Sequence, residues 1–308
     1  MLSAVHPATR ARTLRLGVIA CAVSALAYGF LVLFGRQAFA TGASIPTVIG
    51  WRFAIASAVL VLVVVVARRP WGRGRQVWQP LLMGAVVYAL QNTLFFFALQ
   101  RIPAGLTSLL LYTMPVMVVL LDLARRRLRL SVPLVVAVLL ALLGVGATML
   151  GPIGALSPTG VGAGLLSAVV FTVYYVSMDT LPPDTDWVAS SALVCCGTAA
   201  TQVGVGVLTG TFDPTPGPSV LVAVVPMALV CTVLALSLLM TGVRWAGASV
   251  AAVVSCLEPV SSVVIGVTAL GDPFGPPQAI GAAMVVAAVV VISLQRSPVP
   301  VVVTPVAD

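Results

Sequence analysis

The sequence predicts an all-α integral membrane protein of ten transmembrane helices, arranged as two inverted five-helix repeats with both termini in the cytoplasm. Composition, the length of the apolar blocks and a repeated proline spacing lead to this prediction. Of 308 residues, 60% are hydrophobic and 8% are charged, whereas roughly 25% are charged in a soluble domain. Even large soluble domains keep about a quarter of their unfolded-chain surface in water. The composition therefore excludes a water-soluble fold.

The apolar residues fall in blocks of about 20, the length that a helix needs to cross a bilayer. The blocks lack the polar and apolar alternation of a membrane barrel, so we expect helices. The first block follows basic residues, as in a signal peptide, but it is long enough to span and we expect it to be retained. The expected spans are 16–35, 45–67, 79–99, 104–123, 131–149, 160–180, 187–209, 218–241, 246–269 and 276–294.

These spans divide the chain into five segments. Residues 1–15 form a cytoplasmic tail, 16–149 the first five-helix repeat, 150–159 a connecting loop, 160–294 the second repeat and 295–308 a cytoplasmic tail that we expect to be disordered. The connections are short and rich in proline and glycine, as in 213–218. No soluble domain fits between two spans.

Arginine gives the orientation, because cytoplasmic loops of membrane proteins carry an excess of basic residues. Every basic residue is Arg, and thirteen fall inside when the N-terminus is cytoplasmic. Arg36 and Arg101 fall outside, and Arg52 lies within the second span. We therefore expect a multi-pass protein of the cytoplasmic membrane of a prokaryote.

Other classes of site find little support. The net charge of +8 comes from arginines at span ends, which favours topology over nucleic-acid binding. The five cysteines lie in apolar segments without metal-ligand spacing, and His6 is the only histidine, so we expect no metal and no cofactor. A glycine loop of the Walker type is absent, which excludes ATP as the direct energy source.

An internal repeat relates the two halves. A shift of 144 residues places Pro115 on Pro259 and Pro133 on Pro277, and the first span aligns with the sixth at almost the same shift. Five spans per repeat is an odd number, so the second copy enters the membrane from the opposite side. Inverted repeats of this kind build transporters whose substrate site lies between the halves near the bilayer midplane. A duplication that only stabilises a bundle is the alternative.

The sequence resembles the EamA family of the drug/metabolite transporter superfamily. The resemblance covers nearly the whole chain and implies two five-helix repeats and transport of a small solute. The best matches are 98–107 with Pro115, the small-residue stretch 248–257 ending in Glu258-Pro259, the dipeptide Gly271-Asp272, and Gly281 with Ala288. Two positions depart from the family pattern: Leu128 stands where the first half should carry an acid, and Asp272 is one methylene shorter than the usual glutamate.

Glu258, the only glutamate, is the leading site candidate because it lies inside the ninth span. An ionisable group near the bilayer centre costs on the order of 2.5–3.5 kcal/mol by insertion scales, so it points to function. It can line a central cavity and bind a cationic group or exchange a proton, or it can lock the halves together through an interhelical bond. The residues favour neither reading. Pro259 beside it, like Pro115 in the first half, is expected to kink its helix.

Arg52 is the second ionisable residue within a span, and it can reach the outer surface or pair with Glu258. Membrane helices use polar residues both as packing contacts and as cavity lining. The remaining candidates for the cavity are Tyr88, Gln91, Asn92, Tyr112 and Tyr174.

These observations favour a secondary transporter that moves a small metabolite or drug-like solute by alternating access, with export as the favoured direction. The alternatives are a non-transporting membrane scaffold and a membrane enzyme of the same fold. We expect no enzyme, because the chain shows no cluster of acids, histidines or nucleophiles at one interface. The expected partners are the solute and the lipid bilayer, with the protein a monomer or a homodimer.

Overall fold

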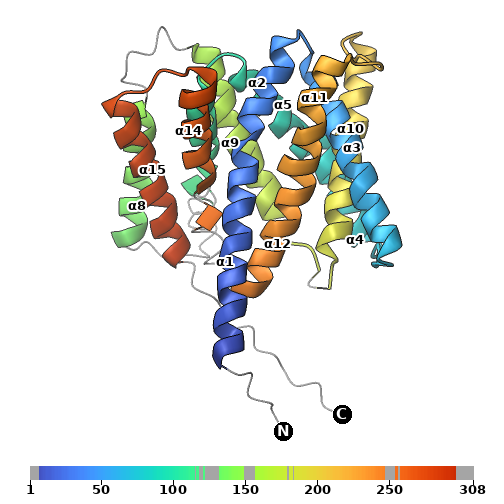
Figure 1. Cartoon of the computed structure of the whole chain (residues 1–308), viewed down its shortest axis with the longest axis horizontal. Helices are drawn as coiled ribbons and strands as arrows, with labels where there is room; N and C mark the ends of the chain where they lie inside the picture. Colours follow the sequence, from blue (N-terminus) through green and yellow to red (C-terminus); the bar gives the residue numbers. More distant parts are fainter. Residues whose placement is uncertain are drawn as a thin grey trace.

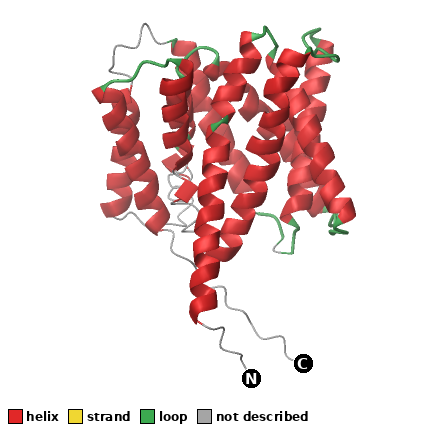
Figure 2. Ribbon diagram, in the orientation of Figure 1, coloured by secondary structure: helices red, strands yellow, loops and turns green. Residues whose placement is uncertain are grey.

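The computed structural model describes residues 7–114, 116–117, 121, 132–148, 157–178, 180–182, 184–246, 254–255 and 257–295. Within these ranges the chain forms helices joined by loops, without strands (Figure 2). The first half contains α1 (Pro7–Gly29), α2 (Leu31–Ala40), α3 (Ile45–Val66), α4 (Arg75–Leu82), the π-helix η1 (Met83–Tyr88), α5 (Ala89–Leu99), α6 (Ala104–Leu111) and α8 (Val132–Thr148). The second half contains α9 (Pro158–Met178), α10 (Trp187–Leu208), α11 (Pro218–Ala228), the π-helix η2 (Leu229–Leu234), α12 (Ala235–Ala246), α14 (Leu257–Leu270) and α15 (Pro276–Gln295).

Each of the ten expected ranges contains described helix. Among the described residues, five helices are long and apolar enough to cross a membrane, namely Thr13–Ala40, Ile45–Val66, Arg75–Leu99, Trp187–Leu208 and Pro218–Leu239, and others such as Leu257–Leu270 are shorter. Large apolar side chains lie on the outer surface of these helices, as expected for contact with lipid. The all-helical membrane fold is thus confirmed, whereas the count of ten spans and their direction remain predictions.

The first helical segment is longer than the sequence analysis predicted. We expected it to end near residue 35, but α2 continues to Ala40. Arg36 stays within it because its guanidinium donates to the carbonyl oxygen of Ile102 at 2.5 Å. A single turn residue, Phe30, separates α2 from α1.

The helices of the two halves pack on one another as a pseudo-two-fold axis requires. Equivalent segments lie together, α3 on α10, α8 on α15 and α6 on α14, while α1 packs on α12 and α5 on α9. The α8–α15 crossing is close, since an added Cβ at Gly144 would lie 2.8 Å from the carbonyl oxygen of Gly281. α1 begins and α15 ends at the same end of the bundle (Figure 1). This arrangement places the two repeats face to face.

Asp272 ties the second half to the first at the opposite end of the bundle. Its Oδ2 accepts a hydrogen bond from the backbone N–H of Ala104 at 2.6 Å, and Ala104 is the first residue of α6. The N–H groups at a helix start have no partner within the helix, so a carboxylate there is stabilising. Asp272 is itself held by its N–H, which donates to the carbonyl oxygen of Gly266 at 2.9 Å. The shorter acid therefore reaches a helix start.

Replacing this carboxylate should weaken the fold measurably. Asp272→Ala leaves the first N–H of α6 without its acceptor, and loss of a capping carboxylate costs about 1 kcal/mol. We expect a lower unfolding midpoint in detergent, measured by intrinsic fluorescence. Asp184→Ala, at an exposed loop residue, is the matched control and should unfold as the wild type does. Equal midpoints for the two variants would contradict a stabilising cap.

Candidate functional site

The helix that carries Tyr112 is interrupted within the bundle. α6 ends at Leu111, and Thr113 donates its N–H to Leu110 at 3.2 Å, three residues back rather than four. The chain then resumes with the N–H groups of Val116 and Met117 both donating to Thr113. Pro115, which we expected to kink this helix, lies outside the described residues. The interruption lies at Tyr112–Thr113, where the helix no longer follows its regular bonding pattern.

The equivalent helix of the second half is described on both sides of residue 256. Residues 254–255 are helical, and α14 (Leu257–Leu270) carries Glu258 and Pro259 in its first turn. Proline is tolerated there, because a first-turn N–H has no partner within the helix. Residues 247–253 and 256 lie outside the described part, so the kink at Pro259 remains a prediction. α14 packs on α6, which brings the two helix ends together.

Tyr112 and Glu258 meet across this junction. The Tyr112 hydroxyl lies 2.7 Å from Oε2 of Glu258 and 3.1 Å from the carbonyl oxygen of Ser255. One hydroxyl hydrogen thus faces two acceptors. It can serve the carboxylate when Glu258 is ionised, and it can turn to Ser255 when a protonated Glu258 donates to the tyrosine oxygen. The pair can therefore accommodate either protonation state without moving a helix.

Arg52 is buried in α3, with 2% of its surface exposed. Its Nε donates to Oγ1 of Thr232 in η2 at 3.0 Å, and its Nη1 donates to Oδ1 of Asn92 in α5 at 3.3 Å. The guanidinium also lies 4.7 Å from the ring centre of Phe53. All of these partners are neutral. Arg52 thereby connects the first half to the second through Thr232.

The ion pair of Arg52 with Glu258, left open by the sequence, does not form. Within the described residues the ion pair is Arg69 with Asp186, at 3.1 Å. Arg52 is bonded to Thr232 and Asn92 instead, and Glu258 is bonded to Tyr112. The two charged residues thus have separate neutral partners and do not neutralise each other.

The two amides of α5 form a chain of hydrogen bonds that begins at Arg52. The Nδ2 of Asn92 donates to Oε1 of Gln91 at 3.0 Å and to the carbonyl oxygen of Tyr88 at 2.9 Å. The Nε2 of Gln91 donates to Oγ of Ser167 in α9 at 3.3 Å. Both amides are buried, and each donates and accepts in these contacts. They therefore orient Arg52 and join the halves.

A related contact occurs on the other side of the pseudo-two-fold axis. Ser24, which aligns with Ser167, donates from its hydroxyl to the carbonyl oxygen of Ala235 at 2.6 Å. The aligned serines therefore each join one half to the other, Ser24 by donating to a backbone carbonyl and Ser167 by accepting from a side chain.

Aromatic rings pack beside the polar groups. The ring centres of Tyr88 and Tyr174 lie 4.8 Å apart, and those of Phe171 and Tyr174 lie 5.8 Å apart with nearly parallel planes. Phe53 meets Tyr88 edge to face at 5.6 Å. The structure thus brings Tyr88 and Tyr174 together, as it does Tyr112 and Glu258. Phe171, which stacks on Tyr174, was not among the predicted site residues.

The two π-helices were also missed by the sequence analysis. η1 ends at Tyr88 and η2 contains Thr232, so both contribute directly to the site. Each begins three residues after a proline, Pro80 or Pro226, and the prolines are 146 residues apart. A proline removes an N–H and disturbs the regular helical pattern, and π-helices are frequent at functional sites. This matched proline pair is the signal that could have revealed them.

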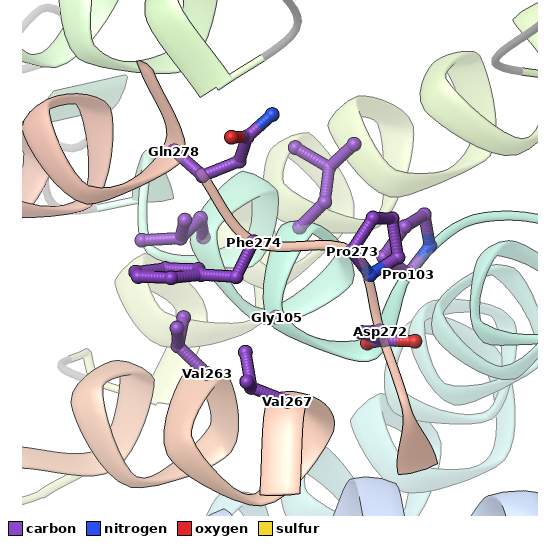
Figure 3. Close-up of a pocket in the computed structure, with 10 residues that line it drawn as sticks. Pro103, Gly105, Val263, Val267, Asp272, Pro273, Phe274 and Gln278 are labelled. Atoms are coloured by element: carbon purple, nitrogen blue, oxygen red, sulfur yellow. The ribbon is translucent and has the colours of Figure 1, made fainter. Parts of the chain in front are cut away.

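Two hollows lie toward the end of the bundle where α14 ends. One, of about 30 Å³, is lined mainly by apolar side chains of α6, α14 and the loop after it, with Val263 and Val267 on one side and Phe274 across from them (Figure 3). It is large enough for little more than water. The other is an open cleft of about 520 Å³ lined by Arg36, Gln37, Phe39, Ala40, Gln100 and Leu270. Of these two hollows, the cleft is the one large enough to admit a small solute.

Comparison with known proteins agrees with this architecture. A sequence model described as the EamA-like transporter family matches residues 15–150 and again residues 158–294. The chain belongs to the EamA-like transporter family. It is therefore a membrane transporter of the drug/metabolite transporter superfamily, as the resemblance implied, and not a member of an enzyme family.

Among solved structures, one titled "Crystal structure of protein" is similar to this EamA-like chain. It shares 22% sequence identity with a TM-score of 0.64, covering 92% of this chain and 97% of the other. At this level of identity the likeness shows the fold alone. A search of curated proteins found no match.

Proposed function

We propose that this EamA-like protein is a secondary transporter that moves a small metabolite or drug-like solute across the cytoplasmic membrane, with export as its direction. The observation that carries the proposal is the junction of the two repeats. There an interrupted helix of the first repeat meets the start of α14 in the second, and Tyr112 contacts Glu258 at 2.7 Å. Transporters of inverted repeats bind solute and coupling ions at such helix interruptions.

The polar contacts at this junction are few and cross from one repeat to the other. Tyr112 contacts Glu258, Arg52 contacts Thr232, and Gln91 contacts Ser167. The remaining core consists mainly of apolar and small side chains. In this proposal one repeat rocks against the other, and these bonds exchange partners as it moves. Such rocking exposes the site to each side of the membrane in turn.

Glu258 and its neighbours form the proposed substrate or proton site. Glu258 is the ionisable residue at the repeat junction, and Tyr112 can follow its protonation state. Tyr88, Gln91, Asn92 and Tyr174 line or support the same region. In this proposal Pro115 and Pro259 set the helix interruptions. The protein needs no cofactor for this cycle, since the gradient of a solute or a proton supplies the energy.

Counterflow in proteoliposomes tests the proposal. Purified protein is reconstituted, the vesicles are loaded with one unlabelled solute at a time, and uptake of the same radiolabelled solute is followed. The panel contains anionic, neutral, cationic and zwitterionic solutes that do not cross protein-free vesicles. We expect transient accumulation of at least one panel member above the protein-free control. If no member accumulates while the protein is folded and correctly inserted, the non-transporting alternatives take precedence.

A further inference from the structure

Arg52 is a buried cation that forms no ion pair with an acid of the described residues. Its guanidinium carries five N–H groups in a rigid planar fork. Toward the described residues, Nε donates to Thr232 and Nη1 donates once to Asn92. The Nη2 group and the second hydrogen of Nη1 are thus available to a further acceptor.

Such a charge is costly to bury in a membrane protein unless a counterion accompanies it. Within the described part of the bundle, the ion pair is Arg69 with Asp186, and Arg52 forms none. Glu258 is instead bonded to Tyr112. Thr232 and Asn92 hold the guanidinium in place through neutral oxygens and do not compensate its charge. The site therefore lacks one negative group.

We propose that Arg52 binds an anionic group of the transported solute, a carboxylate or a phosphate. Two parallel N–H groups of a guanidinium match the two oxygens of either group, and the resulting bonds are charge-assisted. The proposal rests on the proposed transport function and names the class of solute. It is also supported by the hydrogen bonds of Arg52 to the neutral side chains of Thr232 and Asn92, which orient the guanidinium and leave some of its N–H groups without a partner among the described residues.

Aromatic rings lie beside Arg52, and a second cation lies in the open cleft. The rings of Tyr88, Tyr174 and Phe171 form an aromatic group that begins next to Phe53, whose ring the guanidinium covers. The open cleft at the end of the bundle carries a second cation, Arg36, whose Nε is buried without a hydrogen-bond partner among the described residues. A cleft of one sign of charge concentrates ions of the other sign. An anion is therefore favoured at both places.

The test starts from the counterflow panel and asks which charges are carried. For each solute that is moved, an analogue that lacks the charge competes with it: the carboxamide for a carboxylate, or the dephosphorylated parent for a phosphate ester. Carboxylate and phosphate on one skeleton are compared to tell the two anions apart. We expect the moved solutes to be anionic and the neutral analogue to compete at least tenfold less well. Movement of an uncharged or purely cationic solute with equal efficiency would overturn the inference while leaving the transporter intact.

Variants of Arg52 assign the preference to this side chain. Arg52→Gln should remove the tenfold preference for the anion, and Arg52→Lys, which keeps the charge and loses the fork, should retain part of it. Arg101→Gln is the matched control, because Arg101 is exposed and lies over Phe97. An unchanged preference in Arg52→Gln contradicts the inference. If that variant does not fold, the wild-type selectivity and Arg52→Lys decide. Absence of all transport overturns the proposed function and this inference with it.

Discussion

Glu258→Gln should lower transport by roughly tenfold or more and remove its dependence on an imposed proton gradient. Glutamine keeps the size of the side chain and can still bond to Tyr112, but it cannot take up or release a proton. A tenfold loss corresponds to about 1.4 kcal/mol, the order expected when a charge-assisted hydrogen bond becomes a neutral one. The measurement is counterflow of a moved solute at several pH values, with and without a proton gradient. Tyr112→Phe should give a smaller loss, since the carboxyl group remains.

The matched control for this charge change is Asp184→Asn, in an exposed loop outside the site. We expect it to transport like the wild type at every pH. If Glu258→Gln shows the same rate and pH profile as the wild type, Glu258 neither carries a proton nor binds a cationic group. It would then be an interhelical contact, the structural alternative that the sequence left open.

Gly84→Ala should destabilise the protein by about 3 kcal/mol, at the upper end for an overpacked core. An added Cβ at Gly84 would lie 2.7 Å from Cα of Val194 and would also collide with the carbonyl oxygen of that residue. These are backbone atoms of α10, which cannot turn away as a side chain can. Gly197→Ala should act similarly, since its Cβ would lie 2.7 Å from the backbone nitrogen of Ala85. Unfolding midpoints in detergent measure both effects.

Gly204→Ala provides the control within α10. Nothing lies within 4 Å of an added Cβ at Gly204, and alanine is favoured over glycine inside a helix by up to about 1 kcal/mol. Its unfolding midpoint should therefore stay the same or rise. A loss of stability in Gly204→Ala and none in Gly84→Ala would show that the backbones of η1 and α10 are not as close as described.

The membrane class and the repeats could be predicted because they depend on composition and on a long-range spacing. Site residues such as Tyr112 and Glu258 could also be predicted, since a polar side chain within an apolar span is costly and therefore indicates a functional or packing role. Their contact could not be predicted, because it depends on where α6 is interrupted and where α14 starts. The positions of Arg52 and Glu258 along their predicted spans place both at similar depths in the membrane. These positions do not give the direction of each side chain around its helix axis, which decides whether two side chains meet.

The role of Asp272 shows a related limit. Asp272 is one methylene shorter than the glutamate usual in the family, so a role that requires the longer side chain was not expected. The structure shows that reach is set by the backbone, because Gly266 holds the loop so that the carboxylate lies 2.6 Å from the N–H of Ala104. The π-helices posed a different difficulty. They differ from α-helices in backbone hydrogen bonding and in the width of the turn, neither of which changes the hydropathy of the sequence.

The matched π-helices also bear on the history of the chain. A π-helix accommodates one residue more per turn than an α-helix, and η1 and η2 occupy equivalent places 146 residues apart, each after a proline. One insertion before gene duplication accounts for both, whereas separate origins require the same event twice at the same position. We infer that the widened turn was already present in a single five-helix ancestor. Such an ancestor could have formed the same junction only as a dimer, with its second copy in the opposite orientation across the membrane.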